Sequence, residues 1–457
     1  MKYIPNLDKE FQPIVLELRK FNEYVSLKKE KGHVSICLER HDGYNYIYEL
    51  DTFVDGTGYD DENYAIIERL IKSILWIVGG YKIYIKGSHT LFTRIHDDYL
   101  VNGNRKFDSD FMANVYEKPF EVVEVDKLPE LKIEKVELNS DLSGCRIGFD
   151  AGGSDRKVSA VIDGEVVYSE EVVWYPKTNS DPKYHYQGIL EAFRTAASKM
   201  PRVDAIGVSS AGIYVNNRIM VASLFLKVNK EDFDREVKDM YINVAKEIGD
   251  VPLVVANDGD VTALAGAMDL NDNEVLGIAM GTSEAAGYVD DEGNLKGWLN
   301  ELAFVPVDFN KNAMVDEWSG DYGCGVKYFS QDSVIKLAEN NGFKFEEGLS
   351  PAQKLKVIQG LRQENNKLAI DIYDNIGIYL GYTIAYYLEF YKIKYVLLLG
   401  RVTSGDGGEQ ILNKALEVLG TEFPEYKDVK ILMPDEKSRR VGQSIAASSL
   451  PKLKKED

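Results

Sequence analysis

Short apolar runs that end in glycine-rich or small polar turns recur from residue 145 onward, and they constrain the fold more than any other feature of this sequence. Each run is continuously apolar, which is typical of buried strands in an α/β sheet. The turns after the five runs lie at residues 150–154, 209–212, 257–260, 281–283 and 400–408. Ligands of α/β sheets gather at the carboxyl ends of strands, so we expect these turns to converge on one cleft.

The section before these strands, residues 1–139, reads as a small α/β domain without a motif that indicates a chemistry. Two strand-like runs, residues 34–40 and 44–50, flank an Asp-Gly pair, which is a strong hairpin signal. Residues 60–78 place apolar side chains on one helix face and end at a Gly-Gly pair. A strand, a helix and a strand are expected at residues 81–85, 108–116 and 120–125.

Composition narrows the class of partner. The 457 residues include 54 Lys and Arg against 74 Asp and Glu, a formal charge of −20, and basic residues form no dense run. Such a chain repels nucleic acid, so a small molecule is the favoured ligand. Three widely spaced cysteines indicate a reducing compartment. With no signal-peptide core and no apolar stretch of membrane-spanning length, the sequence predicts a cytoplasmic protein without a membrane partner.

The first turn has the composition of a phosphate site. Gly152 and Gly153 lie between two strand-like runs, where the absence of a Cβ lets backbone N–H groups approach a phosphate. Asp150 ends the preceding strand, and a carboxylate there can hold Mg²⁺ through water. An ordinary hairpin with an aspartate at its lip is the alternative.

Asn257 and Asp258 follow a buried strand and open a helix. In a cleft, Asp258 could accept a proton from a substrate hydroxyl while Asn257 hydrogen-bonds a neighbouring hydroxyl. Asparagine and aspartate are also good N-caps, and helix capping is the favoured explanation of the pair taken by itself.

Two later turns are candidates for phosphate binding. Gly281, Thr282 and Ser283 combine a glycine with two hydroxyl donors, although a tight β-turn without a ligand has the same composition. Residues 400–408 stand where a strand meets a helix, and a helix N-terminus offers free N–H groups to an anion or a nucleotide. A long helical section, residues 363–391, precedes this strand.

The order of these motifs resembles the sugar kinase, Hsp70 and actin superfamily, and within it the ROK group of repressors and bacterial sugar kinases. The resemblance covers residues 145–450. It implies an α/β, two-lobed actin-like ATPase fold of the ribonuclease H-like type, with an additional N-terminal domain at residues 1–139. The two lobes would comprise residues 140–285 and 286–457, with the C-terminal helix returning to the first lobe.

The resemblance also implies an ATP- and Mg²⁺-dependent sugar kinase with the nucleotide between the lobes. Asp258 corresponds to the general base, and Asn257 to a sugar contact. The first phosphate and Mg²⁺ turn corresponds to Asp150, Gly152, Gly153 and Ser154, the second to Gly281, Thr282 and Ser283, and a third nucleotide segment to Gly400, Ser404 and Gly405. Ser210, Gly212 and Glu301 carry over as further substrate-binding residues, the last from a Glu-x-Gly-His element that here lacks its histidine.

The sequence departs from the family pattern in several places. Only Cys324 remains of the family's cysteine cluster, so no zinc site is expected. Residues 316–325 are instead similar to a segment of N-acetylglucosamine kinase and of activator-type ATPases. Ser283 and Glu284 replace a glycine-containing turn and would place a carboxylate near the γ-phosphate, and Arg401 stands where glycine is usual.

These departures leave an alternative to the kinase, namely a ROK-like ligand sensor or assembly protein with little or no turnover. Two further clusters are interpreted as structural. His89, His96, Asp97 and Asp98 are assigned to a solvated loop, and the segment around His185 to a surface loop. Tyrosines at helical spacing between residues 379 and 387 predict core packing or a subunit interface. The second possibility would imply a homodimer.

Overall fold

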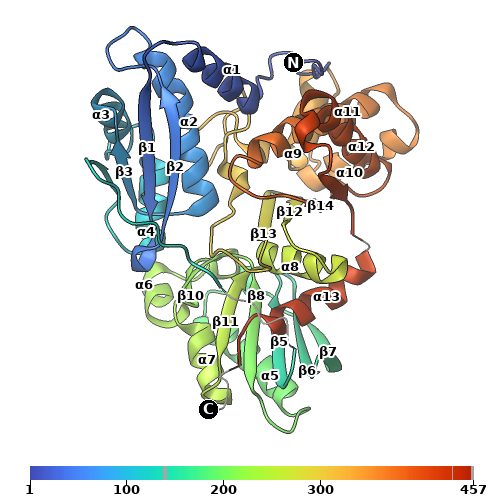
Figure 1. The fold of residues 1–457 in the computed structure, drawn as a ribbon. Helices are drawn as coiled ribbons and strands as arrows, with labels where there is room; N and C mark the ends of the chain where they lie inside the picture. Colours follow the sequence, from blue (N-terminus) through green and yellow to red (C-terminus); the bar gives the residue numbers. More distant parts are fainter. Residues whose placement is uncertain (137–141, 435, 454–457) are drawn as a thin grey trace. The chain divides into compact units, whose positions relative to one another are not determined.

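A computed structural model describes residues 1–136, 142–434 and 436–453 of the chain (Figure 1). The chain forms two compact units. The first unit comprises Met1–Glu134, Ile278–Ala286 and Gly297–Met433. The second unit comprises Lys135–Gly277, Gly287–Lys296 and Pro434–Asp457.

The N-terminal part of the first unit is a four-stranded sheet in the order β2-β1-β3-β4. Its strands are β1 (Gly32–Glu39), β2 (Asn45–Thr52), β3 (Lys82–Lys86) and β4 (Glu121–Glu124). The Asp-Gly signal is confirmed, because β1 and β2 are antiparallel and joined at residues 41–43. All four strands thus lie at or beside the positions expected from the sequence.

Four helices accompany this sheet: α1 (Ile14–Ser26), α2 (Asp60–Val78), α3 (His89–Asp98) and α4 (Lys106–Tyr116). Helix α2 has the bounds predicted from its apolar period, and its central apolar residues are buried. The prediction that His89, His96, Asp97 and Asp98 lie in a solvated loop is wrong. Those residues form α3, which Ser88 caps by accepting a hydrogen bond from the backbone of Leu91, and the Asp98 side chain is buried.

The second unit is built on a five-stranded sheet in the order β11-β8-β5-β6-β7. Its strands are β5 (Cys145–Ala151), β6 (Asp155–Ile162), β7 (Glu165–Val173), β8 (Ala205–Ser210) and β11 (Leu253–Asn257). The pairs β5–β8 and β8–β11 are parallel, so the three strands end at the same edge. A small hairpin, β9 (Ile213–Val215) and β10 (Arg218–Val221), follows β8.

Helices of the second unit pack on this sheet. They are α5 (Pro182–Ala197), α6 (Lys230–Asp232), α7 (Met240–Ile248), α8 (Asp258–Leu270) and α13 (Glu436–Ser449). Helix α13 contacts β5, β8 and α8. A Cβ at Gly207 would lie 1.6 Å from the Ala447 carbonyl oxygen, so α13 lies directly against β8. His185, assigned to a surface loop, is instead buried on α5.

A second four-stranded sheet has the order β13-β12-β14-β15. Its strands are β12 (Val275–Met280), β13 (Glu284–Val289), β14 (Tyr395–Leu399) and β15 (Lys430–Leu432). The neighbouring helices of the first unit are α9 (Gln331–Asn340), α10 (Pro351–Gln363), α11 (Lys367–Tyr387) and α12 (Asp406–Glu422).

The helical section expected at residues 363–391 is confirmed as α11 (Lys367–Tyr387), which begins four residues later and ends four residues earlier than expected. Asn365 adopts a left-handed conformation with φ 58°, and the Asn366 side chain caps α11. The tyrosines of α11 are core residues. Tyr379 and Tyr386 are buried, and their hydroxyls bond Asp8 and Ser73 of the N-terminal part. Helix α11 therefore fastens the N-terminal domain to the remainder of the first unit. No helix in the described part of the chain is long and apolar enough to span a bilayer.

Candidate active site

Three of the predicted site segments meet at one edge of the second unit's sheet, where β5, β8 and β11 end. Asp150 of β5 lies opposite Ser209 of β8, and Asn257 of β11 lies opposite Ser210. Because parallel strands present their carboxyl ends together, these side chains share one edge. The structure therefore brings together the motifs at residues 150, 210 and 257, which are far apart in the sequence.

Asp150 is a buried carboxylate with one strong partner. The Ser209 hydroxyl donates a hydrogen bond of 3.0 Å to Asp150 Oδ1. Burial raises the pKa of Asp150 to about 6, the Ser209 bond and the charge of Lys157 oppose the rise, and the charge of Asp258 adds to it. The carboxyl groups of Asp150 and Asp258 are therefore close enough for their charges to interact.

Asp258 is the first residue of α8 and is half-buried. Its Oδ1 accepts a hydrogen bond of 3.0 Å from the backbone N–H of Gly259. Burial raises the pKa of Asp258, and the backbone bond and the positive charge of Lys177 oppose the rise. A carboxylate with a raised pKa is a stronger base than an ordinary aspartate, which suits proton abstraction.

Asn257 is the N-cap of α8, as the capping alternative proposes. Its Oδ1 accepts a hydrogen bond of 2.8 Å from Gly259 N–H, and its Nδ2 donates to the Gly212 carbonyl at 2.7 Å. The amide thus ties the turn after β8 to the start of α8. Ser210 is buried and receives a hydrogen bond of 3.1 Å from the Tyr241 hydroxyl.

The turn between β5 and β6 is contacted by side chains from elsewhere in the chain, which the sequence alone does not indicate. A Cβ at Gly153 would lie 2.9 Å from the Nζ of Lys177, so the ammonium group lies directly over the glycine. Trp174 Nε1 donates to the Gly152 carbonyl at 2.8 Å, and the Ser154 hydroxyl donates to Asp155 at 3.2 Å. The turn thus places a lysine ammonium group directly against its glycine backbone.

Lys177 is a candidate functional residue that sequence reasoning misses. It lies on a short 3₁₀ turn, Pro176–Thr178, and no motif marks it. Lys177 is exposed and makes no ion pair with a carboxylate in the described part of the chain. Because its ammonium group lies over Gly153 and its charge acts on Asp258, Lys177 places positive charge between the predicted phosphate turn and the predicted base.

In the first unit, the turns after β12 and β14 lie side by side. Gly400 has φ 96°, a Cβ there would lie 2.3 Å from the Met280 carbonyl oxygen, and Val402 N–H donates to the same oxygen. Arg401 Nη2 donates a hydrogen bond of 3.1 Å to the hydroxyl of Thr282. The two predicted nucleotide segments of this unit are therefore in direct contact.

The remaining residues of these two turns are held by backbone bonds. Gly281 N–H donates to the Ser283 carbonyl at 2.9 Å, and the Ser404 hydroxyl lies 3.5 Å from the Gly400 carbonyl. Gly405, with φ 72°, is the N-cap of α12. The first N–H groups of this 17-residue helix have no acceptor within the helix, and the exposed Arg401 lies four residues before the cap in the sequence.

The sequence suggests a carboxylate at the second predicted phosphate turn, but the structure buries Glu284 away from solvent. It is 3% exposed, it lies beside Gly325, and neither carboxyl oxygen has a hydrogen-bond partner among the described residues. Burial and the negative charge of Glu301 raise its pKa well above the ordinary range. Glu284 is therefore a neutral, buried acid that neighbours Glu301.

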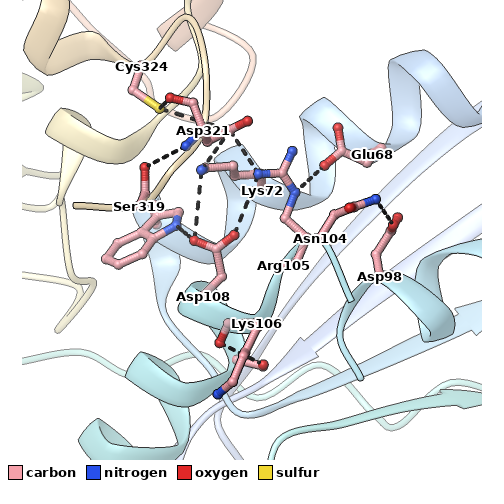
Figure 2. A network of polar contacts seen from close by, with 12 residues as sticks. Glu68, Lys72, Asp98, Asn104, Arg105, Lys106, Asp108, Ser319, Asp321 and Cys324 are labelled. Carbon is pink, nitrogen blue, oxygen red and sulfur yellow. Dashed lines mark hydrogen bonds and ion pairs between the residues drawn. The ribbon is translucent and has the colours of Figure 1, made fainter. Parts of the chain in front are cut away.

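Oxygen ligands suited to Mg²⁺ are present at the edge of the second unit, where Asp150 retains a second carboxyl oxygen and lies close to Asp258. Among the described residues, no group of three or more His, Cys, Asp and Glu side chains is arranged to hold a metal ion. Cys324 is buried, and burial raises its thiol pKa to about 12. It lies beside Lys72 and Asp321 (Figure 2).

The fold is shared with solved ROK proteins. The ROK hexokinase from Thermus thermophilus aligns at 16% identity with a TM-score of 0.52, covering 66% of this chain and 98% of that chain. Glucokinase from Parabacteroides distasonis aligns at 14% identity with a TM-score of 0.50, covering 68% and 97%. A ROK transcriptional regulator homologous to the E. coli MLC protein aligns at 18% identity with a TM-score of 0.48, covering 67% and 78%.

These likenesses confirm the predicted fold class, an α/β two-lobed actin-like fold with an additional N-terminal α/β part. No curated protein matches the chain. A model of the ROK family matches residues 146–445, which is more than half of the sequence and contains the turns described above. The chain belongs to the ROK family.

Proposed function

We propose that this protein transfers a phosphoryl group from ATP to a hydroxyl of a sugar or a sugar-like polyol, with Asp258 as the general base. The observation that carries the proposal is the placement of Asp258 beside Asp150 and Lys177, at a strand edge next to a Gly-Gly turn. The ROK hexokinase and glucokinase that share the fold support the same reaction class.

The residues divide the chemistry between them. Asp258 accepts the proton of the attacking hydroxyl, and its raised pKa strengthens it as a base. Lys177, whose ammonium group lies over Gly153, attracts the negative charge that grows on the transferred group, and backbone N–H groups of the Gly152 and Gly153 turn assist it. Mg²⁺, when bound near Asp150, would neutralise charge on the ATP phosphates.

The turns of the first unit have a nucleotide role in this proposal. Arg401 has no carboxylate partner within the described residues and already bonds Thr282. A guanidinium at the joined Gly281 and Gly400 turns provides a fixed fork for phosphate oxygens. Arg401 thus supplies positive charge at a position where the family usually has glycine, and Glu301 is assigned to the sugar.

The test is ATP consumption over a panel of sugars by the parent and by Asp258→Asn. Loss of the base should lower kcat about 10²–10⁴-fold with little change in the Kd for AMPPNP. Asp269→Asn is the matched control, because Asp269 is an exposed aspartate of the same helix. An Asp258→Asn variant as fast as the parent would show that the base is misassigned.

The ligand sensor is the alternative, and calorimetry separates it from the kinase. The kinase should bind AMPPNP with Mg²⁺ and consume ATP when a sugar is present. A sensor would bind a sugar without ATP consumption, and its sugar affinity would not change when Lys177 is replaced.

A further inference from the structure

A cavity lies within the first unit beside the polar residues of α2, and we name it the α2 pocket. It has a volume of about 610 Å³ and is lined by α2, by Arg94 of α3, by residues 104–105 and by residues 309–322. This volume falls within the range of about 300–1,000 Å³ that is usual for small-molecule sites. None of the proposed kinase residues lines it.

The floor of the α2 pocket is a buried ionic cluster (Figure 2). Its members are three cations and three carboxylates, namely Arg69, Lys72, Arg105, Glu68, Asp108 and Asp321. Arg69 contacts Glu68 at 2.6 Å and Asp321 at 2.9 Å, and Lys72 contacts Asp321 at 2.7 Å. The carboxylates of the floor are therefore already paired and repel an incoming anion little.

Arg105 leaves part of its guanidinium unused. Its Nε bonds Glu68 and its Nη1 contacts Asp321 at 2.9 Å, while its Nη2 has no hydrogen-bond partner among the residues that the structure describes. The side chain is 8% exposed and lines the pocket. A nearly buried guanidinium with an unused N–H edge is a strong donor to an oxyanion.

The walls add further positive charge and aromatic surface. Arg94 stacks on Tyr64 at 3.8 Å and bonds Asp61 at 2.8 Å, while Lys311 is exposed and makes no ion pair with a described residue. Outside the neutral floor, two cations thus face one carboxylate, in a chain whose formal charge is −20. Phe309 and Tyr322 supply apolar area.

We propose that the α2 pocket binds a small organic anion, a carboxylate or a phosphate ester. Arg105, Arg94 and Lys311 hold its oxyanion group, and its carbon body rests against Phe309 and Tyr322. All three side chains line the pocket, guanidinium and ammonium groups are the usual donors to oxyanions, and the aromatic rings favour an organic ligand over inorganic phosphate. This site is separate from the proposed kinase residues and does not depend on their activity.

Calorimetry of the full chain with citrate and with glycerol 3-phosphate tests the proposal, and glycerol serves as the uncharged probe. We expect a Kd of about 1 mM or tighter for at least one anion and no binding of glycerol. Arg94→Gln and Lys311→Gln should each weaken the anion about tenfold, because each removes a charge-assisted contact at the rim. The two anions distinguish a carboxylate site from a phosphate site.

Two controls keep the result specific. Lys344→Gln removes an exposed lysine of the same unit outside the pocket and should leave the anion affinity unchanged. Arg401→Gln should also leave it unchanged, since Arg401 lies at the nucleotide turns. The proposal is overturned if neither anion binds, or if Arg401→Gln abolishes binding that Arg94→Gln and Lys311→Gln do not affect. Circular dichroism establishes that each variant is folded.

Discussion

Glu284 provides a direct test of the electrostatics of the first unit, because its carboxyl group is buried without a partner among the described residues. Burial and the charge of Glu301 raise its pKa well above the ordinary value of 4.5. An acid whose pKa is higher in the folded protein binds its proton more tightly there than in the unfolded chain. Its favourable contribution is complete below pH 4.5 and is lost as the pH rises toward the folded-state pKa.

The size of the effect follows from proton linkage. Within that pH window the folded protein holds about one more proton at this site than the unfolded chain, so the free energy of unfolding falls by about 1.4 kcal/mol per pH unit. Glu284→Gln preserves the shape of the side chain and has no proton to lose, so the loss should be absent.

Urea unfolding followed by circular dichroism at several values between about pH 5.5 and pH 7.0 measures this difference. The unfolding free energies of the parent and Glu284→Gln should diverge steadily in favour of the variant as the pH rises. Glu346→Gln, which changes an exposed glutamate of the same unit, should follow the parent. Parallel curves for the parent and Glu284→Gln would refute the conclusion that Glu284 is buried as a neutral acid.

Three other substitutions test separate parts of the structure. Lys177→Met should raise the KM for ATP about tenfold and move the acidic limb of the kcat/KM profile to higher pH, because Lys177 opposes the rise in the pKa of Asp258; an unmoved limb would contradict that coupling. Lys72→Met should destabilise the protein by about 3–5 kcal/mol in urea unfolding, since it leaves buried carboxylates less compensated. Gly207→Ala should lower Tm by several degrees in a thermal melt, because its Cβ would overlap the Ala447 carbonyl.

Much of the fold could be predicted because the periodic segments are long and apolar. Residues 60–78 form a helix with the predicted bounds, since the apolar period and the Gly-Gly stop agree. The sequence does not indicate helix α3, because only three of its residues are buried and its many polar residues are typical of a loop. The start of α11 depends on one left-handed asparagine and one cap, and neither interrupts the apolar pattern, so the expected helix begins four residues too early.

The candidate site divides in the same manner. Asp150, Asn257 and Asp258 could be found because each lies at the end of a buried strand or directly after it, and parallel strands end together. Lys177 could not be found, because its position over Gly153 depends on a short turn that returns to the sheet. The cluster under the α2 pocket was equally hidden, since Arg69 and Asp321 are 252 positions apart.

The distribution of positive charge links these findings to the acidity of the chain. A protein with a formal charge of −20 repels anions at long range, so any anion it binds must be attracted by a few local cations and by backbone N–H groups. Lys177 and Arg401 each lie against a glycine turn and make no ion pair with a described carboxylate, whereas Arg69 and Lys72 are neutralised by buried acids. Lys177 and Arg401 therefore keep positive charge that a bound anion can use, which the net charge of the chain does not reveal.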